Sequence, residues 1–121
     1  MEILPKPENL IKFLKSEHSG PVDMVNVLRF KPHKRLEYEK YAKAIGGFMK
    51  DFGMETIYSG DVFSTILGEE EFFHHVIIMR YPSKEKFIEF SSSEKWQAIE
   101  HHRTEGLESQ WLLATKENSL A

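Results

Sequence analysis

Residues 72–83 read Phe72-Phe73-His74-His75-Val76-Ile77-Ile78-Met79-Arg80-Tyr81-Pro82-Ser83, and the architecture of the chain follows from this run. Residues 72–81 predict a strand, and Pro82-Ser83 ends it, with Ser83 as a suitable N-cap for a helix. A sheet face in contact with water alternates apolar and polar side chains, whereas this strand is apolar on both faces. Helices of the same chain can cover only one face. We therefore expect a second copy to cover the other, in a twofold-symmetric homodimer.

Apolar periodicity on either side of this run predicts the remaining elements. They are a leading helix over 5–20, a strand over 22–30, a helix over 35–52, a strand over 54–67 broken near 59–61, a helix from 83 that is interrupted at 91–93 and resumes with Ser93 as N-cap to 102, and a strand over 107–115. After the leading helix the order is βαββαβ, the ferredoxin-like arrangement of an α+β domain with an antiparallel four-stranded sheet. We expect a single domain, in which an N-terminal helix (1–20) packs on the ferredoxin-like part (21–121).

Two features leave structural questions open. Gly46-Gly47 sits inside a helical pattern, where each glycine costs about 1 kcal/mol relative to alanine. We interpret the pair as close packing against a sheet or a second subunit. In the first strand, Val25 and Val27 point to one face and Asn26 to the other. The sequence does not decide which of these faces meets the helices.

Composition limits the classes of partner. The chain has 121 residues, of which 40% are hydrophobic and 29% charged, and its formal net charge is −3. This balance gives no basic footprint for nucleic acid. The chain has no cysteine, which excludes disulfides and thiolate metal sites. It carries no apolar run of about 18 residues, so we expect no membrane span and a soluble, cytoplasmic protein.

Three motifs resemble a known family. They are Gly20-Pro21-Val22-Asp23-Met24-Val25-Asn26-Val27-Leu28-Arg29-Phe30, Arg80-Tyr81-Pro82-Ser83 and His102-Arg103-Thr104-Glu105-Gly106-Leu107. They resemble the first strand, the crossover and the entry to the last strand of an uncharacterised family, domain of unknown function 1330, in the dimeric α/β-barrel superfamily. The resemblance implies two ferredoxin-like subunits whose sheets close a barrel. It implies no reaction, because relatives include cofactor-free monooxygenases, lactone isomerases, haem enzymes and ligand sensors.

Asn26 and Arg80 are candidate ligand-binding residues. Asn26 lies within an apolar strand, so its amide either orients a ligand from the barrel side or belongs to a structural hydrogen-bond network. Arg80 can bind a ligand carboxylate or enolate through its two-pronged donor geometry. The alternative for Arg80 is an ion pair at the strand end, including one across the dimer.

His102, Arg103 and Tyr58 complete the candidate set. A histidine near a cavity mouth is suited to proton transfer near neutral pH, so His102 is the candidate base. Arg103 or Arg80 would stabilise the resulting anion. Alternatively, His102 and Arg103 are cations at a helix C-terminus, which complement the helix dipole. Tyr58 belongs either to an aromatic cavity or to core and interface packing.

A metal or other cofactor is not predicted. His74 and His75 are neighbours on a strand and face opposite sides, so they do not readily bind one ion. His101 and Glu105 lie four residues apart, but no third or fourth ligand follows at a recognisable spacing. No single histidine stands out as an axial haem ligand.

Two hypotheses about function remain, and the sequence leaves open whether the protein is an enzyme. In the first, a small, partly apolar carbonyl-type molecule is bound or converted without a cofactor in a barrel cavity, by monooxygenase-like or isomerase-like chemistry. It predicts that the candidate polar residues converge on one apolar pocket. In the second, the protein is a non-enzymatic dimerisation or interaction module with a solid core.

Overall fold

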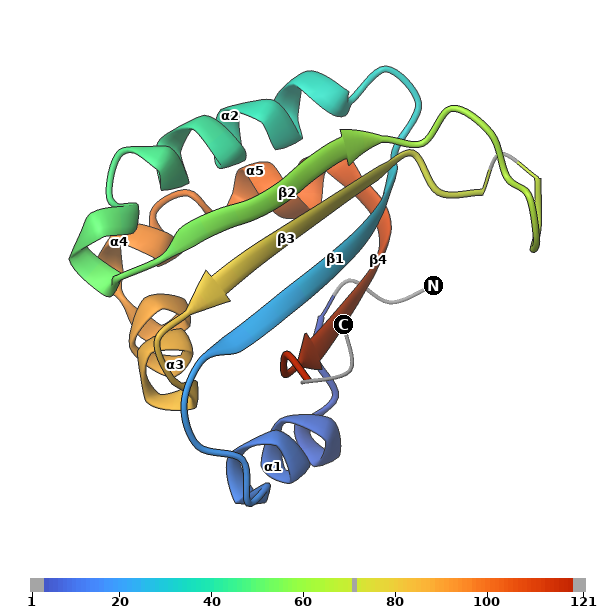
Figure 1. Ribbon diagram of the computed structural model, residues 1–121. Helices are drawn as coiled ribbons and strands as arrows, with labels where there is room; N and C mark the ends of the chain where they lie inside the picture. The colour runs from blue at the N-terminus through green and yellow to red at the C-terminus, as the bar shows by residue number, and fades with distance from the viewer. Residues whose placement is uncertain (1–3, 71, 119–121) are drawn as a thin grey trace.

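The computed structural model describes residues 4–70 and 72–118. A four-stranded antiparallel sheet in the order β2-β3-β1-β4 forms its frame (Figure 1). The strands are β1 (Val22–Phe30), β2 (Glu55–Asp61), β3 (His75–Tyr81) and β4 (Leu107–Thr115). The helices are α1 (Pro7–Lys15), α2 (Arg35–Gly46), α3 (Lys84–Ser92), α4 (Glu94–Gln97), α5 (Glu100–Gly106) and the 3₁₀ helix η1 (Met49–Phe52). The α+β class and the ferredoxin-like arrangement are as predicted.

The helices cover the face of β1 that carries Met24 and Leu28. Both side chains are buried, Met24 beside residues of β3 and α3 and Leu28 beside Tyr38 and Tyr41 of α2. Figure 1 shows α2 and α5 lying along this side of the sheet. The even-numbered positions of β1 therefore form the core, which is the choice that alternation by itself left open.

The opposite face of the sheet is apolar and uncovered in this chain. Val25 pairs with Ile78 of β3 and with Leu113 of β4, and Val27 pairs with Trp111. Trp111 is 53% exposed and Leu113 45% exposed. We call this surface the open face.

Four expected boundaries were wrong. The leading helix, expected over 5–20, spans Pro7–Lys15. The strand expected from residue 72 begins at His75, and the His74 ring accepts a hydrogen bond from the Phe30 N–H at 3.0 Å. The strand expected to reach residue 67 ends at Asp61, and residues 62–70 form a projecting loop. The helix expected to reach residue 52 ends at Gly46, followed by η1.

The interpretation of Gly46-Gly47 as close packing against the sheet was also wrong. A Cβ built at Gly46 would have no neighbour within 4 Å in the described chain. A Cβ at Gly47 would meet only the Ala44 carbonyl oxygen of its own helix, at 3.2 Å. Here the glycines mark the end of α2, and packing against a second subunit remains the other interpretation.

Serine caps start two of the helices in the crossover. The Ser83 hydroxyl accepts from the Lys86 N–H at 3.1 Å, and the Ser93 hydroxyl accepts from the Trp96 N–H at 3.2 Å. Each cap satisfies a backbone donor that the first helical turn leaves without a partner. Both caps are as predicted.

The leading helix α1 lies at the end of the sheet near α3 (Figure 1). Its Phe13 ring meets Phe87 edge-on at 5.7 Å, and Lys84 Nζ donates to the Ser16 carbonyl at 2.6 Å. None of the α1 residues, all of which the structure describes, is buried. Among the described helices, none has the length and apolarity needed to cross a membrane.

Candidate functional site

Asn26 lies on the helix-covered side of β1. Its Nδ2 donates to the carbonyls of Met24 and Ile77, each at 3.3 Å. Its Oδ1 accepts from Gln110 Nε2 of β4 at 2.7 Å. The amide is therefore satisfied within the chain, in the structural network that was one of its two expected roles.

Arg103 extends this network into α5. The side chain is buried, and it donates to Gln110 Oε1 and to Glu100 Oε1, each at 2.8 Å. The result is a chain of polar groups from Asn26 through Gln110 and Arg103 to Glu100. The guanidinium is thus paired with a carboxylate and held beneath the helices, away from the open face.

Two buried tyrosines lie in the same layer. Burial raises the pKa of Tyr38 and of Tyr41, and the nearby Arg103 charge opposes this only in part. The Tyr41 hydroxyl accepts from Trp96 Nε1 at 2.8 Å. Both phenols therefore remain neutral near neutral pH.

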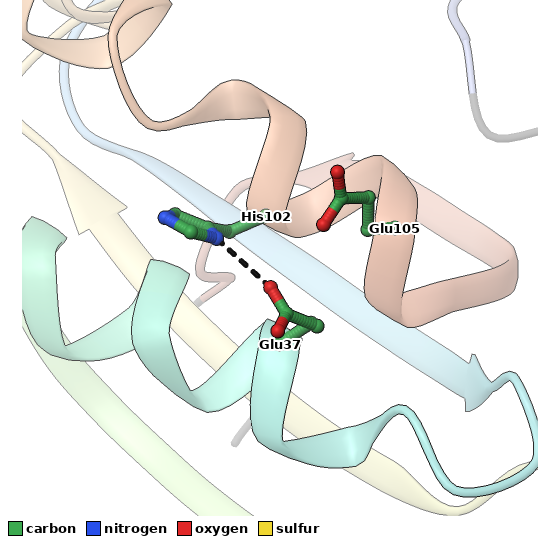
Figure 2. A group of neighbouring side chains, drawn as sticks. All are labelled: Glu37, His102 and Glu105. Atoms are coloured by element: carbon green, nitrogen blue, oxygen red, sulfur yellow. Dashed lines mark hydrogen bonds and ion pairs between the residues drawn. The ribbon is translucent and has the colours of Figure 1, made fainter.

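His102 faces α2. Its Nδ1 lies 3.0 Å from Glu37 Oε2, and Lys40 Nζ lies 2.9 Å from Glu37 Oε1. The hydrogen bond from Lys40, followed by that from His102, lowers the pKa of Glu37 to about 2. Glu105 adds a second carboxylate to this group, as Figure 2 shows. From the sequence, His101 and Glu105 were the possible pair of metal ligands, whereas the fold groups Glu105 with His102 and Glu37.

Arg80 lies on the open face and makes an ion pair within the chain. Its Nε and Nη2 donate to the two carboxylate oxygens of Asp23 at 2.7 and 2.9 Å, and Nη2 also meets Glu117 at 3.2 Å. The Arg80 hydrogen bonds hold the pKa of Asp23 below its usual range. Arg80 thus forms the strand-end ion pair that was one of its two expected roles, although 31% of its side chain stays exposed.

Tyr58 lies on the open face of β2, where it pairs with Ile78 of β3. It is 56% exposed. Its ring lies over Gly60, where any Cβ would collide with it. The absence of a side chain at Gly60 therefore leaves room for the phenol ring on the open face.

A groove of about 600 Å³ lies on the open face beside the projecting loop. Val27, Phe73 and Trp111 form its apolar walls, and Ser64 and Thr65 add hydroxyl groups. Its volume is in the range of small-molecule sites, which are mostly apolar with a few polar groups. Residues 62–67 were expected to continue a strand, so the sequence did not predict that this segment lines a groove.

A second hollow of about 600 Å³ lies at the end of β1, and basic side chains line much of it. Arg29 there pairs with Glu108 at 2.6 Å, and Arg35 pairs with Asp61 at 2.6 Å. The hydrogen bond from Arg35 lowers the pKa of Asp61. Because both arginines already have carboxylate partners, this hollow is a weaker candidate than the groove.

The five predicted residues do not converge on one pocket. Asn26 and Arg103 share the network under the helices, and His102 faces α2. Arg80 and Tyr58 lie across the sheet on the open face. The catalytic roles expected for His102 and Arg103 remain predictions, as does ligand binding by Asn26, Arg80 and Tyr58.

Comparisons with known proteins place the chain in a broad structural group. A family model described as a domain of unknown function, DUF1330, matches residues 26–116. No curated protein matches the chain significantly in sequence.

Solved structures share the fold. A protein of unknown function from Rhodopseudomonas palustris has a TM-score of 0.90 at 23% identity, with 98% of each chain covered. A dimeric protein of unknown function with a ferredoxin-like fold from Bacteroides fragilis has a TM-score of 0.60 at 11% identity, covering 80% of this chain and 96% of that one. A putative antibiotic biosynthesis monooxygenase from Caulobacter crescentus has a TM-score of 0.63 at 14% identity, covering 84% and 92%. At these identities the likeness concerns the fold.

Proposed function

The chain belongs to DUF1330, a family defined as a domain of unknown function, so we propose its function from its own geometry. We propose that the protein is a homodimer with a small, partly apolar carbonyl-type molecule between its two open faces. The protein either binds this molecule or acts on it without a cofactor. The observation that carries this proposal is the groove beside Val27 and Trp111. An apolar sheet face of this kind is expected to be buried against another apolar surface, and the open face of a second copy would supply one.

The shared fold supports the dimer. The Bacteroides fragilis protein with this fold is dimeric. Two open faces packed together would bury Trp111 and Leu113, which are about half exposed in the single chain. The groove beside the loop would then become an enclosed cavity.

Polar groups at the edges of the open face would orient the ligand. The Tyr58 hydroxyl can donate a hydrogen bond to a carbonyl oxygen. Arg80 can stabilise an enolate or carboxylate at the far end of β3 while it keeps Asp23 as a partner. This part of the proposal does not depend on His102 or Arg103, which lie on the other side of the sheet. A cytoplasmic location stays a prediction.

The test uses two simple carbonyl probes, benzaldehyde and benzoylacetone. Their binding to the purified dimer is measured by saturation-transfer NMR. We expect saturable binding by the wild-type protein. Trp111→Ala, which removes a groove wall, should weaken it at least about tenfold, or about 1.4 kcal/mol. Arg35→Gln, an arginine outside the groove, should leave binding unchanged.

A second candidate is an interaction module with a solid interface. It is favoured by the projecting loop, where Phe63 is 99%, Ile66 90% and Leu67 94% exposed. These side chains are large enough to fill the groove of a partner copy. A dimer that binds neither probe would favour this module, and a monomer would contradict both candidates.

A further inference from the structure

We propose that Glu37, His102 and Glu105 form a binding site for a divalent transition-metal ion that bridges α2 and α5 (Figure 2). Glu37 comes from α2, and the other two come from α5 on the helix side of the sheet. The site is separate from the groove on the open face. It is independent of the function proposed above.

The distances suit one ion. His102 Nδ1 lies 3.0 Å from Glu37 Oε2. Two ligand atoms bound at right angles to one metal, with bonds of about 2.1 Å, lie about 3 Å apart. One potential ligand atom from each of the three residues lies within 4.8 Å of the other two. Ligands on opposite sides of an ion are about 4.2 Å apart, so the exposed Glu105 side chain needs only a small rotation.

Burial and charge also favour the site. The side chains of Glu37 and His102 are 22% and 27% exposed, so they are held by the fold yet open to an ion from solvent. Lys40 pairs with Oε1 of Glu37 and leaves Oε2 directed at His102. Lys40 is exposed and can move aside if the carboxylate becomes bidentate.

The helix pair is held close by Gly106. A Cβ at this position would lie 2.7 Å from the Tyr38 backbone nitrogen and 3.2 Å from the Lys34 carbonyl oxygen. With no side chain there, the end of α5 packs directly on the first turn of α2. The ligands from the two helices are therefore positioned before any ion arrives, which lowers the cost of ordering them.

The donor set indicates the class of ion. One imidazole nitrogen with two carboxylates suits Zn²⁺, Co²⁺ or Mn²⁺ better than Mg²⁺, which prefers all-oxygen coordination and keeps its waters. Three protein ligands would leave the remaining positions to water. Because the ion would bind the folded chain, it would also raise the stability of the α2–α5 pair.

The test is titration of tag-free, EDTA-treated protein with Zn²⁺ by isothermal calorimetry, together with thermal unfolding. We expect saturable binding at one ion per chain and a higher Tm, with no such effect from Mg²⁺ at the same concentration. Glu105→Gln should weaken Zn²⁺ binding at least about tenfold. Glu105 is exposed, so this variant should fold normally. His102→Ala should weaken binding as much or more.

Glu39→Gln is the matched control for Glu105→Gln, because Glu39 is an exposed carboxylate on α2 and does not belong to the cluster. It should bind Zn²⁺ like the wild-type protein. The proposal is overturned if the wild-type protein shows no saturable binding, if Glu105→Gln binds as tightly as wild type, or if Glu39→Gln loses as much affinity as Glu105→Gln.

Discussion

The Glu37 carboxylate shows how two neighbouring hydrogen-bond donors act on a single residue. Lys40 contributes most to lowering its pKa to about 2, and His102 contributes next. The folded-state pKa therefore lies below the ordinary value of 4.5. A group of this kind stabilises the fold above pH 4.5, and its contribution is lost as the pH falls toward 2.

We therefore predict that Glu37→Gln, measured in EDTA, flattens the pH dependence of the free energy of unfolding between pH 4.5 and about 2. The variant should be less stable than wild type at pH 6 and should approach it at the acid end. Urea unfolding at a series of pH values measures both effects. Glu39→Gln, an exposed carboxylate on the same helix, is the control. Equal pH slopes for wild type and Glu37→Gln would contradict the assignment.

Asn26 shows how neighbouring groups stabilise a neutral polar side chain within the sheet. Three hydrogen bonds satisfy its amide inside an apolar sheet, and their partners belong to β1, β3 and β4. An amide left without these bonds would cost about 1–3 kcal/mol. A strand asparagine is thus explained here by its neighbours in the sheet, which the sequence order does not reveal.

At the scale of elements, the contact of α5 with α2 depends on a missing side chain. We predict that Gly106→Ala lowers the free energy of unfolding by about 1–3 kcal/mol, because its Cβ would press on backbone atoms of α2 that cannot easily move. Chemical denaturation of the variant measures this loss.

Gly46→Ala is the matched substitution, for which we expect the opposite effect on the free energy of unfolding. A Cβ there meets nothing within 4 Å in the chain, so we expect a gain of up to about 1 kcal/mol from the better helix former. A loss at Gly46 would instead show that a second subunit packs on it. A neutral Gly106→Ala would show that α5 shifts freely on α2.

The projecting loop is an element that local pattern misassigned. The apolar residues within 62–67 predicted that the strand would continue through this segment. β2 nevertheless ends at Asp61, which pairs with His75 of β3, and one further backbone hydrogen bond runs from the Val62 N–H to the His74 carbonyl at 3.0 Å. A strand exists only where a neighbour accepts its backbone hydrogen bonds, so propensity could not set this boundary.

At the scale of the molecule, the open face determines assembly. We predict that the free chain dimerises and that its Tm rises with protein concentration, since the dimer forms only from folded copies. Leu113→Glu should give a monomer, because it places a charge on the apolar open face, beside Val25. Analytical ultracentrifugation measures the mass.

Leu36→Glu is the control for this substitution. Leu36 is 71% exposed on α2, on the side of the sheet away from the open face. This variant should remain dimeric. Dimers that survive Leu113→Glu would place the interface elsewhere.

The sequence by itself determined the order of elements, the α+β class, the serine caps and the apolar character of the open face. These follow from interactions along the chain or from alternation within one strand, which are local and can be read from residue spacing. It also supplied the resemblance that the family match then bore out.

Only the tertiary structure decided how the candidate residues group. It put Asn26 and Arg103 under the helices, Arg80 and Tyr58 on the open face, and Glu37 beside His102 from 65 positions away in the chain. The physical reason is that such contacts depend on strand register and on the close approach of two helices at a glycine. Both are set by packing of the whole domain, and spacing within any one segment does not contain them.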